Sequence, residues 1–423
     1  MKLLTYPRIG ESCYEQRLSN GMLVRVVPKR GFARKYAFVA VDFGAIDTSF
    51  CRNGADVRVP DGIAHYLEHK MFDLPEGNAD GMFAALGASP NAFTSYSMTA
   101  YHFSCTEHFA ENLRLLLRMV TTPYFTPESV EKERGIITQE IRMYEDNAEQ
   151  RAAEDLFAAL YQEHPVRTSI AGTVESIGHI TAQSLYDCFR AFYQPSDMVL
   201  CVTGDVDAEE VLKIAEEMTP QECAVLPERL YGAPETMQPV RARTERSMEI
   251  SMPTFSLGFK CEPAGKGMDS MRREIIGDIA AEILVGESSP LYQRLYESGL
   301  IDGGFSVGYE SVKDACLISA SGDSTDPEAV LNAILAEGER IAREGFEQEL
   351  FRRLKKSALG RRTRDLDSLE SICYRICAYQ FDGADYFEFP AAYASVTPED
   401  VQDFLTNVIR PARAALSVVR PKK

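Results

Sequence analysis

The chain has 423 residues, and its 45 Lys and Arg against 63 Asp and Glu give a formal net charge of −18. This acidic excess argues against a nucleic-acid-binding protein, because such proteins need a basic surface. Hydrophobic residues make up 45% of the chain and charged residues 26%, values that are typical of a globular protein and not of a disordered one. The length predicts about two or three domains.

Nothing in the sequence predicts export or a membrane span. The apolar run at the N-terminus is short and is interrupted by Pro7, so it does not fit a signal peptide. No stretch approaches the roughly 18 apolar residues that cross a bilayer. Ten cysteines are scattered through the chain without a CxxC pair, and no second pair of Cys or His completes a zinc site with Cys373 and Cys377. We therefore expect reduced, mostly buried thiols in a cytoplasmic protein.

Residue periodicity predicts a mixture of strands and helices in the first half of the chain. The expected strands are 22–28, 36–43, 99–105 and 198–204. The expected helices are 60–73, 79–86, 108–120, 127–146, 149–163 and 181–192. Because pairs of strands alternate irregularly with runs of helices, the pattern favours an α+β fold over a doubly wound parallel sheet.

The second half of the chain repeats this mixture. It opens with an expected strand at 247–260 and closes with one at 414–420. The expected helices between them are 270–285, 289–298, 326–343, 347–362 and 366–379.

Two segments near the ends of the halves indicate an internal duplication. Residues 180–202 and 396–418 align without a gap. Each predicts an amphipathic helix that begins at a capping threonine, Thr181 or Thr397, and ends at a proline that leads into an apolar strand. Two unrelated helix–strand units could match by chance, but a gapless match near the end of each half favours duplication.

The duplication predicts where the domains divide. Residues 221–245 contain several prolines and little helical periodicity, so they are expected to form a linker. The linker separates an N-terminal domain, 1–220, from a homologous C-terminal domain, 246–423. We expect two α/β sandwich halves, each an antiparallel-rich sheet covered by helices.

A candidate metal motif lies in GIAHYLEHKMFD, residues 62–73. His65, Glu68 and His69 are spaced HxxEH, and on an α-helix these three side chains share one face. Two imidazoles one turn apart can bind the same metal ion, and the carboxylate beside them can reach a metal-bound water. The inverted order relative to HExxH is typical of inverzincins. The alternative is a pair of surface histidines on a polar helix face.

A third ligand is expected on a downstream helix. Residues 128–145 read ESVEKERGIITQEIRMYE, and Glu133 and Glu140 lie two helical turns apart on one face. Acidic residues on a helix are most often simply solvated. The residue pattern alone leaves Glu133 and Glu140 as equal candidates.

Several segments together resemble the pitrilysin/insulinase family of zinc peptidases, which includes the mitochondrial processing peptidase. Besides the HxxEH helix, the resemblance rests on NAFTSYSMTAYHF (91–103), ERGIITQEI (133–141), HPVRTSIAGTVESI (164–177) and FYQPSDMVLCVTGDVD (192–207). It covers nearly all of the first half and, more thinly, the second. It implies two homologous halves that form half of a clamshell, with the metal site in the first half only.

The resemblance assigns roles to individual residues. It implies one Zn²⁺ per chain, held by His65, His69 and Glu140, with Glu68 as the general base. It makes Glu133 a residue that supports catalysis without binding the metal. It also implies that Asn91, Ala92 and Phe93 lie on an edge strand that binds the substrate backbone, a mode that tolerates varied side chains. The expected activity is that of a metalloendopeptidase acting on oligopeptides or small unfolded proteins.

One family feature is missing. Family members usually carry an Arg and a Tyr seven residues apart in the second half, and these hold the substrate against the zinc. In SSPLYQRLYESGLIDGGFSV, residues 288–307, Tyr296 stands in place of the Arg and Ile301 or Asp302 in place of the Tyr. A shifted alignment, with Phe305 as the aromatic residue, is the alternative.

The missing pair leads to a hypothesis about partners. We expect this chain to be the zinc-bearing subunit of a heterodimer whose homologous partner supplies the Arg and Tyr, with a homodimer as the other possibility. No nucleic-acid or membrane partner is expected. The rival function is a non-catalytic peptide-binding or scaffold subunit of a processing complex, which would have no need for the His65, Glu68, His69 and Glu140 set.

Overall fold

The computed structural model describes residues 1–222 and 224–422; residue 223 of the predicted linker and residue 423 lie outside the description. The chain divides into two compact units that are each discontinuous in sequence. Unit 1 comprises Met1–Ile141, Ser169–Tyr231 and Thr363–Glu388. Unit 2 comprises Arg142–Thr168, Gly232–Arg362 and Phe389–Lys423.

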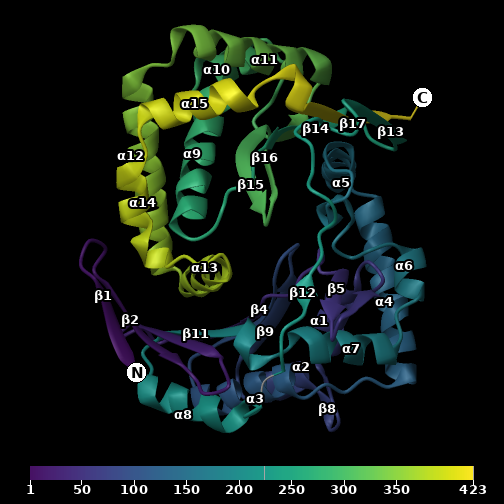
Figure 1. Ribbon diagram of the computed structural model, residues 1–423, viewed down its shortest axis with the longest axis vertical. Helices are drawn as coiled ribbons and strands as arrows, with labels where there is room; N and C mark the ends of the chain where they lie inside the picture. Colours follow the sequence, from purple (N-terminus) through teal and green to yellow (C-terminus); the bar gives the residue numbers. More distant parts are fainter. Residues whose placement is uncertain (223, 423) are drawn as a thin grey trace. The chain divides into compact units, whose positions relative to one another are not determined.

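Unit 1 is built on a seven-stranded mixed sheet with the order β1-β2-β3-β11-β4-β10-β9 (Figure 1). Its strands are β1 Lys2–Tyr6, β2 Glu11–Arg17, β3 Leu23–Pro28, β4 Lys35–Val41, β9 Ser89–Thr94, β10 Thr99–Cys105 and β11 Met198–Gly204. The central strand β11 runs parallel to β3 and antiparallel to β4. All seven of its residues are buried, which explains why its sequence is a continuous apolar run without alternation.

Smaller elements and helices complete unit 1. The strands β5 Ser49–Arg52, β6 Ala55–Arg58 and β12 Glu228–Arg229 form one small sheet, and β7 Asp73–Leu74 and β8 Gly77–Asn78 form another. The helices are α1 Ile63–Lys70, α2 Ala79–Ala85, α3 Phe109–Thr121, most of α4 Pro127–Glu145, α6 Val174–Gly178, α7 Ala182–Phe192, α8 Ala208–Met218 and α13 Leu369–Phe381.

Helices cover both faces of the unit 1 sheet. Side chains alternate along β10, so His102 and Phe103 point to opposite faces. The Phe103 ring packs against Phe109 of α3, with 5.9 Å between ring centroids. On the other face, the Cys373 thiol of α13 lies 3.6 Å from the carbonyl oxygen of Cys201 in β11. The sheet is thus a buried layer, and only its edge strands are left for other contacts.

Unit 2 repeats the sheet of unit 1 in a shorter form, with the order β13-β17-β14-β16-β15. Its strands are β13 Arg243–Met248, β14 Thr254–Cys261, β15 Ser306–Val312, β16 Ala315–Asp323 and β17 Ala414–Pro421. The parallel pair β13–β17 corresponds to β3–β11, and the antiparallel series β17-β14-β16-β15 corresponds to β11-β4-β10-β9. The common pairing pattern agrees with the duplication inferred from the sequence.

The helices of unit 2 are α5 Ala148–Leu160, α9 Met268–Val285, α10 Pro290–Glu297, α11 Pro327–Glu344, most of α12 Gln348–Arg364, α14 Phe389–Ser395 and α15 Pro398–Val408. The short 3₁₀ helices of the two units are η1 Pro165–Arg167, η2 Pro195–Asp197, η3 Asp365–Asp367, η4 Tyr386–Glu388 and η5 Pro411–Arg413.

The two repeated helices begin as the sequence predicts. The Thr181 hydroxyl caps α7 and accepts a hydrogen bond from the Ser184 N–H at 3.1 Å. The Thr397 hydroxyl does the same for α15 with the Asp400 N–H at 3.2 Å. In both helices the third residue bonds back to the N–H of the threonine and completes a capping box. Both predicted N-caps are confirmed.

Each half of the chain supplies one helix to the sheet of the other half. α5, from the first half, packs on β14 and β17 in unit 2. α13, from the second half, packs on β4 and β11 in unit 1. This exchange explains why both units are discontinuous in sequence.

The predicted α+β fold is confirmed, and most predicted elements lie within a few residues of their observed bounds. The predicted strand 247–260 is wrong in one respect, because the structure has two strands, β13 and β14, separated by residues 249–253. Pro253 has no N–H to give to a strand ladder, and the two strands lie on either side of β17. Among the elements that the sequence did not predict are the strands β1, β2, β5, β6, β15 and β16 and the helices α8 and α14.

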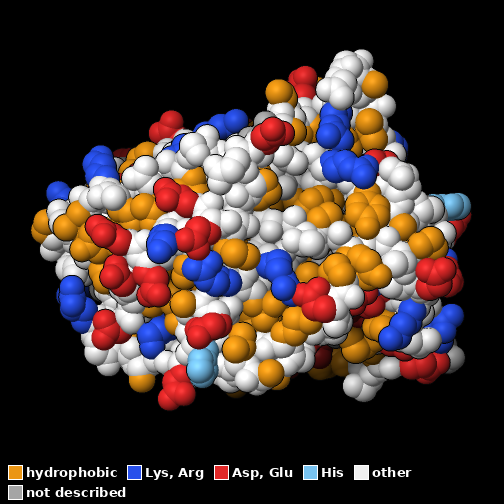
Figure 2. Space-filling model, turned by 90° about the horizontal axis from the view of Figure 1, so that it is seen from below, with side chains coloured by type: hydrophobic (Ala, Val, Ile, Leu, Met, Phe, Trp, Pro, Cys, Tyr) orange, Lys and Arg blue, Asp and Glu red, His pale blue; other side chains and the backbone are white. Residues whose placement is uncertain are grey.

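In the described part of the chain, no helix combines the length and apolarity that crossing a bilayer requires. The nine cysteines that the structure describes are all free, and all but Cys51 are buried. On the face seen in Figure 2, acidic and basic side chains are interspersed among apolar ones. The negative net charge is therefore not gathered into a single acidic patch on that face.

An ion cluster fixes the strand β12 to unit 1. The Arg229 guanidinium lies 2.8 Å from a carboxylate oxygen of Asp197, 3.2 Å from one of Asp47 and 3.5 Å from one of Asp42. Asp47 and Asp197 are buried and Asp42 is half-buried, and one guanidinium cannot neutralise three carboxylates. Burial consequently raises the pKa of Asp197 to about 7 and that of Asp47 to about 6, although Arg229 opposes the shift.

These raised pKa values predict a pH dependence of stability. Between pH 4 and 7 Asp197 is mostly protonated in the folded protein but mostly ionised in the unfolded chain. Because the folded state binds more protons over this interval, the free energy of unfolding decreases as the pH rises. Asp197→Asn, which mimics the protonated form, should gain stability relative to the original chain over this interval, by at most about 1.4 kcal/mol per pH unit. Urea unfolding of both proteins from pH 5 to pH 8 measures the difference. Asp187→Asn, at a half-exposed position on α7, serves as a control. Parallel curves for Asp197→Asn and the original chain would contradict the prediction.

Candidate metal centre

The helix α1 carries the HxxEH motif and is held close to a neighbouring loop. It begins after Gly62, whose φ of 87° favours glycine, and a Cβ atom there would lie 2.4 Å from the carbonyl oxygen of Ala171. Ile63 and Leu67 are buried, as their apolar spacing suggests. His65 and Glu68 are 7% and 8% exposed, so this face of the helix is not a solvated polar face.

His65, His69 and Glu140 converge on one point. The two imidazole rings lie 4.7 Å apart between centroids. Nε2 of His65 is 3.6 Å from Oε1 of Glu140, and Nε2 of His69 is 3.5 Å from Oε2 of Glu140. One potential ligand atom from each residue lies within 4.8 Å of the other two. Two imidazoles and one carboxylate match a zinc site that keeps a fourth position open for water.

Glu133 contacts His69 from the other side. Its Oε1 atom lies 3.0 Å from Nδ1 of His69, which leaves Nε2 directed toward Glu140. Burial disfavours the charged form of His69, but hydrogen bonds to Glu133 and Glu140 outweigh it and raise the pKa of His69 to about 10. The same hydrogen bond lowers the pKa of Glu133. A carboxylate that fixes the second nitrogen of an imidazole is a common support for metal-binding histidines.

Glu68 lies beside the cluster of His65, His69 and Glu140 but is not one of its potential metal ligands. Its Oε2 atom accepts a hydrogen bond of 2.7 Å from the Thr94 hydroxyl. Burial raises the pKa of Glu68, while His65 and the hydrogen bond from Thr94 oppose the rise. A buried carboxyl with a raised pKa, held in one orientation, is suited to accept and return a proton.

The strand β9 forms one edge of the unit 1 sheet and contacts α1. It carries Asn91, Ala92 and Phe93, which pair with His102, Tyr101 and Ala100 of β10. Among the described strands, β9 pairs with β10 alone, so its other edge is open to a further strand.

Comparisons with known proteins agree with a metal centre of the peptidase type. Residues 55–174 match the family profile "Insulinase (Peptidase family M16)", and residues 179–358 match "Peptidase M16 inactive domain". The chain is 37% identical over 431 residues to the uncharacterized zinc protease YmfH of Bacillus subtilis, covering 100% of both chains. The chain belongs to the insulinase (M16) family of peptidases.

Other M16 relatives extend the comparison. The crystal structure of an M16-like peptidase candidate from Alicyclobacillus acidocaldarius is 33% identical, with a TM-score of 0.93 over 99% of this chain and 100% of that one. The probable mitochondrial-processing peptidase subunit beta of Schizosaccharomyces pombe is 26% identical over 251 residues, which is 58% of this chain and 53% of that one. The predicted family is therefore confirmed.

The segment that usually carries the Arg and Tyr of M16 peptidases lies in unit 2. Tyr296 is 54% exposed and stacks on Tyr292 of the same helix, α10. Arg294 pairs with Glu337 at 3.2 Å. Phe305 is 6% exposed and packs into unit 2, so it does not supply the missing aromatic side chain at the surface.

Two contacts of this M16 site are not predicted by the sequence. Thr94 lies within the family-like segment 91–103, but no residue pattern indicates that its hydroxyl bonds to Glu68, which is 26 residues away in sequence. The Tyr66 hydroxyl donates a hydrogen bond to the Val130 carbonyl and so ties α1 to α4. Tyr66 is fully buried, and a buried tyrosine hydroxyl requires such a partner.

The contact between Glu133 and His69 predicts an effect on metal affinity. Among the described residues, Nδ1 of His65 is buried without a hydrogen-bond partner, so Glu133 is the group that orients an imidazole here. Glu133→Gln should therefore weaken zinc binding by about 10- to 100-fold. Titration of the metal-free protein against a chromophoric zinc chelator measures this change, with the exposed Glu128→Gln as the control. Equal affinities for both variants would contradict the assigned role.

Proposed function

We propose that this chain is a zinc-dependent endopeptidase that cleaves oligopeptides or small unfolded proteins. The observation that carries the proposal is the convergence of His65, His69 and Glu140 in unit 1, with Glu68 beside them on α1. We further assign the chain to a reducing, cytoplasmic environment, which is supported by the nine free cysteines among the described residues.

Each side chain has a role in this proposal. His65, His69 and Glu140 would hold one zinc ion, which when bound supplies a Lewis acid and a water of lowered pKa. Glu68 takes the proton of the attacking water and passes it to the leaving amine. Thr94 holds one carboxylate oxygen of Glu68, which keeps the other oxygen free for the proton. Glu133 keeps the His69 ring in its ligand orientation.

The substrate is proposed to add to the sheet of unit 1. The open edge of β9 offers main-chain donors and acceptors at Asn91, Ala92 and Phe93, next to α1. Strand addition reads the peptide backbone and leaves side-chain specificity loose. This mode suits a peptidase that acts on extended or unfolded chains.

Replacing the proposed general base tests the chemistry. Glu68→Gln should keep zinc, because it leaves His65, His69 and Glu140 in place, but should lose peptidase activity by about 100- to 10,000-fold. Zinc content by atomic spectroscopy and cleavage of a quenched fluorescent peptide library measure the two effects separately. Glu131→Gln, an exposed substitution on α4, is the control. A chain that binds no zinc would refute the mechanism and leave the scaffold function.

We also propose that full activity needs a second subunit. The exposed Tyr296 on α10 replaces the Arg that M16 peptidases usually place at this position, and the buried Ile301 or the exposed Asp302 replaces the Tyr. A heterodimer with a homologous chain that carries both residues would restore them, whereas a homodimer would not.

The partner requirement predicts the rate of the isolated chain. Because loss of a group that stabilises the transition state costs about 100-fold or more, the zinc-loaded chain alone should cleave peptides slowly. Its specific activity should stay constant as its own concentration rises, and should increase when a homologous chain with the Arg and Tyr is added. Fast cleavage by the pure chain, or specific activity that rises with its own concentration, would overturn the heterodimer.

A further inference from the structure

Two cysteines lie side by side in the sheet of unit 2. Cys261 ends the strand β14, and Cys316 is the second residue of the neighbouring antiparallel strand β16. The two residues are directly opposite each other in the register of these strands. Their side chains therefore project from the same face of the sheet. Both are free thiols, and neither has a role in the proposed peptidase mechanism.

The register places the two cysteines within the range that a disulfide spans. Directly opposite residues of an antiparallel pair have Cα atoms about 4.5 to 5.5 Å apart. A disulfide requires a Cα separation of about 4.4 to 6.8 Å. The Cys261 sulfur now lies 3.6 Å from the carbonyl oxygen of Phe259, and the Cys316 sulfur lies 3.3 Å from the Ser311 hydroxyl. A rotation about each Cα–Cβ bond can turn the sulfurs toward each other, so the bond can form without a shift of the strands.

This arrangement belongs to unit 2 and not to the repeated fold. Among the described residues, no other two cysteines are opposite each other in a strand pair. The helices α9, α10, α11 and α12 follow β14 in the order in which α1, α2, α3 and α4 follow β4. The strands of unit 1 that correspond to β14 and β16 are β4 and β10, and their equivalent end pair is Val41 and Thr99.

Cys316 lies close to the surface, although both cysteines are buried. Cys261 is 2% exposed, and Cys316 has no exposed surface. Ser311, whose hydroxyl contacts the Cys316 sulfur, is itself exposed near the end of β15. The turn that joins β15 to β16, residues 313–314, is also close to Cys316. A small molecule therefore needs only a local opening of this hairpin end to reach the Cys316 sulfur.

The reduced thiols are the resting form of the pair. Burial raises the pKa of Cys261, although the Ile318 N–H and the charge of Arg273 oppose the shift. A protonated thiol is a weak nucleophile. Oxidation of the pair consequently requires a small and reactive oxidant, and a peroxide meets both conditions.

We propose that Cys261 and Cys316 form a reversible disulfide when the chain is exposed to hydrogen peroxide. First, the Cys316 sulfur attacks one peroxide oxygen and the O–O bond breaks, which gives a sulfenic acid and one water. Next, the Cys261 sulfur attacks the sulfenic sulfur, the S–O bond breaks, and a second water leaves. Two thiols and one hydrogen peroxide thus give one disulfide and two waters. Two molecules of a thiol such as glutathione restore both cysteines and become glutathione disulfide.

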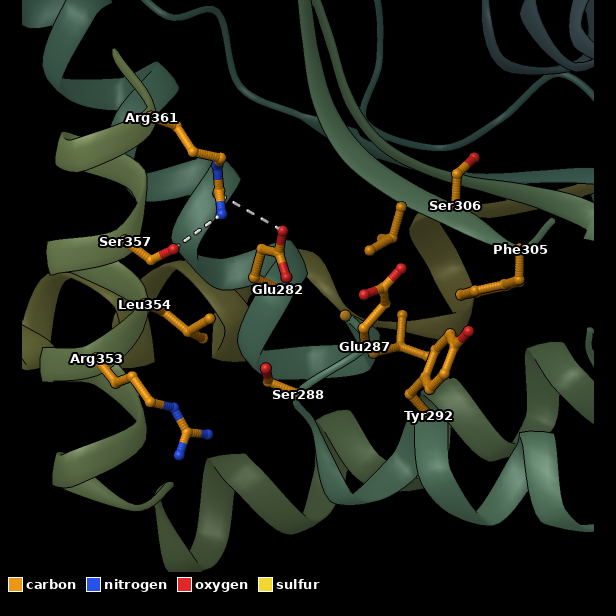
Figure 3. Close-up of a pocket in the computed structure, with 13 residues that line it drawn as sticks. Glu282, Glu287, Ser288, Tyr292, Phe305, Ser306, Arg353, Leu354, Ser357 and Arg361 are labelled. Atoms are coloured by element: carbon orange, nitrogen blue, oxygen red, sulfur yellow. Dashed lines mark hydrogen bonds and ion pairs between the residues drawn. The ribbon is translucent and has the colours of Figure 1, made fainter. Parts of the chain in front are cut away.

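The disulfide would close a covalent loop within unit 2. The loop runs from Cys261 to Cys316 and contains α9, α10 and β15. The same segment supplies most of the lining of a cavity of about 410 Å³, and α12 supplies the rest (Figure 3). Because a cross-link restricts the unfolded chain, the oxidised protein should resist unfolding more than the reduced one. The inference requires neither zinc nor peptidase activity, so it stands apart from the proposed function.

Peroxide treatment of the full chain tests the proposal. Cys51→Ser and Cys223→Ser first remove the half-exposed cysteine and the cysteine outside the described residues. The reduced chain is treated with hydrogen peroxide, and the remaining thiols are blocked with iodoacetamide in denaturant. Mass spectrometry of the digest should show a peptide that links Cys261 to Cys316. The intact chain should lose about 2 Da, the mass of two hydrogen atoms, and dithiothreitol should reverse the loss.

Two comparisons show whether the native register causes the link. Cys316→Ser should abolish the linked peptide, whereas Cys188→Ser, an equally buried substitution on α7, should retain it. Oxidation of the chain in concentrated urea should give a mixture of pairings, because the register is lost there. This second comparison needs no variant in the sheet, so it remains decisive if Cys316→Ser fails to fold.

Each outcome supports or overturns the proposal. A link between Cys261 and Cys316 that predominates in the native chain but not in urea supports it. A link of Cys201 with Cys373 or Cys377, whose thiols lie near that of Cys201, in place of the proposed one overturns it. Full alkylation of Cys261 and Cys316 after peroxide, or oxidation to sulfinic acid without a disulfide, also overturns it. Finally, the oxidised chain should unfold at a higher urea concentration than the reduced chain, and a lower midpoint would contradict a bond that fits the native strands.

Discussion

The site in unit 1 depends on one constraint: two imidazoles of α1 and two carboxylates of α4 share a partly buried space. Such groups are costly to bury unless each has a partner. Glu133 bonds to Nδ1 of His69. The carboxylate of Glu140 lies between Nε2 of His69 and Nε2 of His65. The two helices must therefore keep a fixed spacing and rotation. Apolar residues of α4, such as Ile137, and the bond from Tyr66 to Val130 maintain that geometry.

The two copies of the fold carry different side chains at corresponding places. Both units have a mixed sheet with one pairing pattern, and both have an open edge strand in contact with a helix, β9 with α1 and β15 with α9. In unit 1 the helices α1 and α4 bring together imidazoles and carboxylates, which suit a cation. In unit 2 the corresponding helix α12 presents two arginines and a serine to a cavity that also contains Glu282 and Glu287. The difference lies in a few side chains, since function resides in a site and not in the fold that supports it.

The exchange of α5 and α13 shows how the two halves depend on each other. Each sheet buries one face against a helix from the other half of the sequence. Removal of either half would expose a strand surface that is fully buried here, such as that of β11 or β14. The halves are therefore not expected to fold independently, even though each has its own sheet and core.

The sequence by itself determined the local features of this protein. The 3.6-residue period puts His65, Glu68 and His69 on one helix face, the hydroxyls of Thr181 and Thr397 start the repeated helices, and the apolar run of β11 marks a buried strand. These features follow from contacts between residues that are near in sequence. The strands β15 and β16 escaped prediction because their segments contain Ser, Gly and charged residues and lack a clear apolar alternation.

Only the tertiary structure decided which groups meet. Glu133 and Glu140 lie on the same face of α4, and the packing of α4 against α1 determines that one contacts Nδ1 of His69 while the other faces the Nε2 atoms. In the same way, the amphipathic patterns of α5 and α13 show that each has an apolar face but not which sheet it covers. Helical periodicity fixes the direction of a side chain relative to its own axis, whereas its partner depends on how distant segments pack.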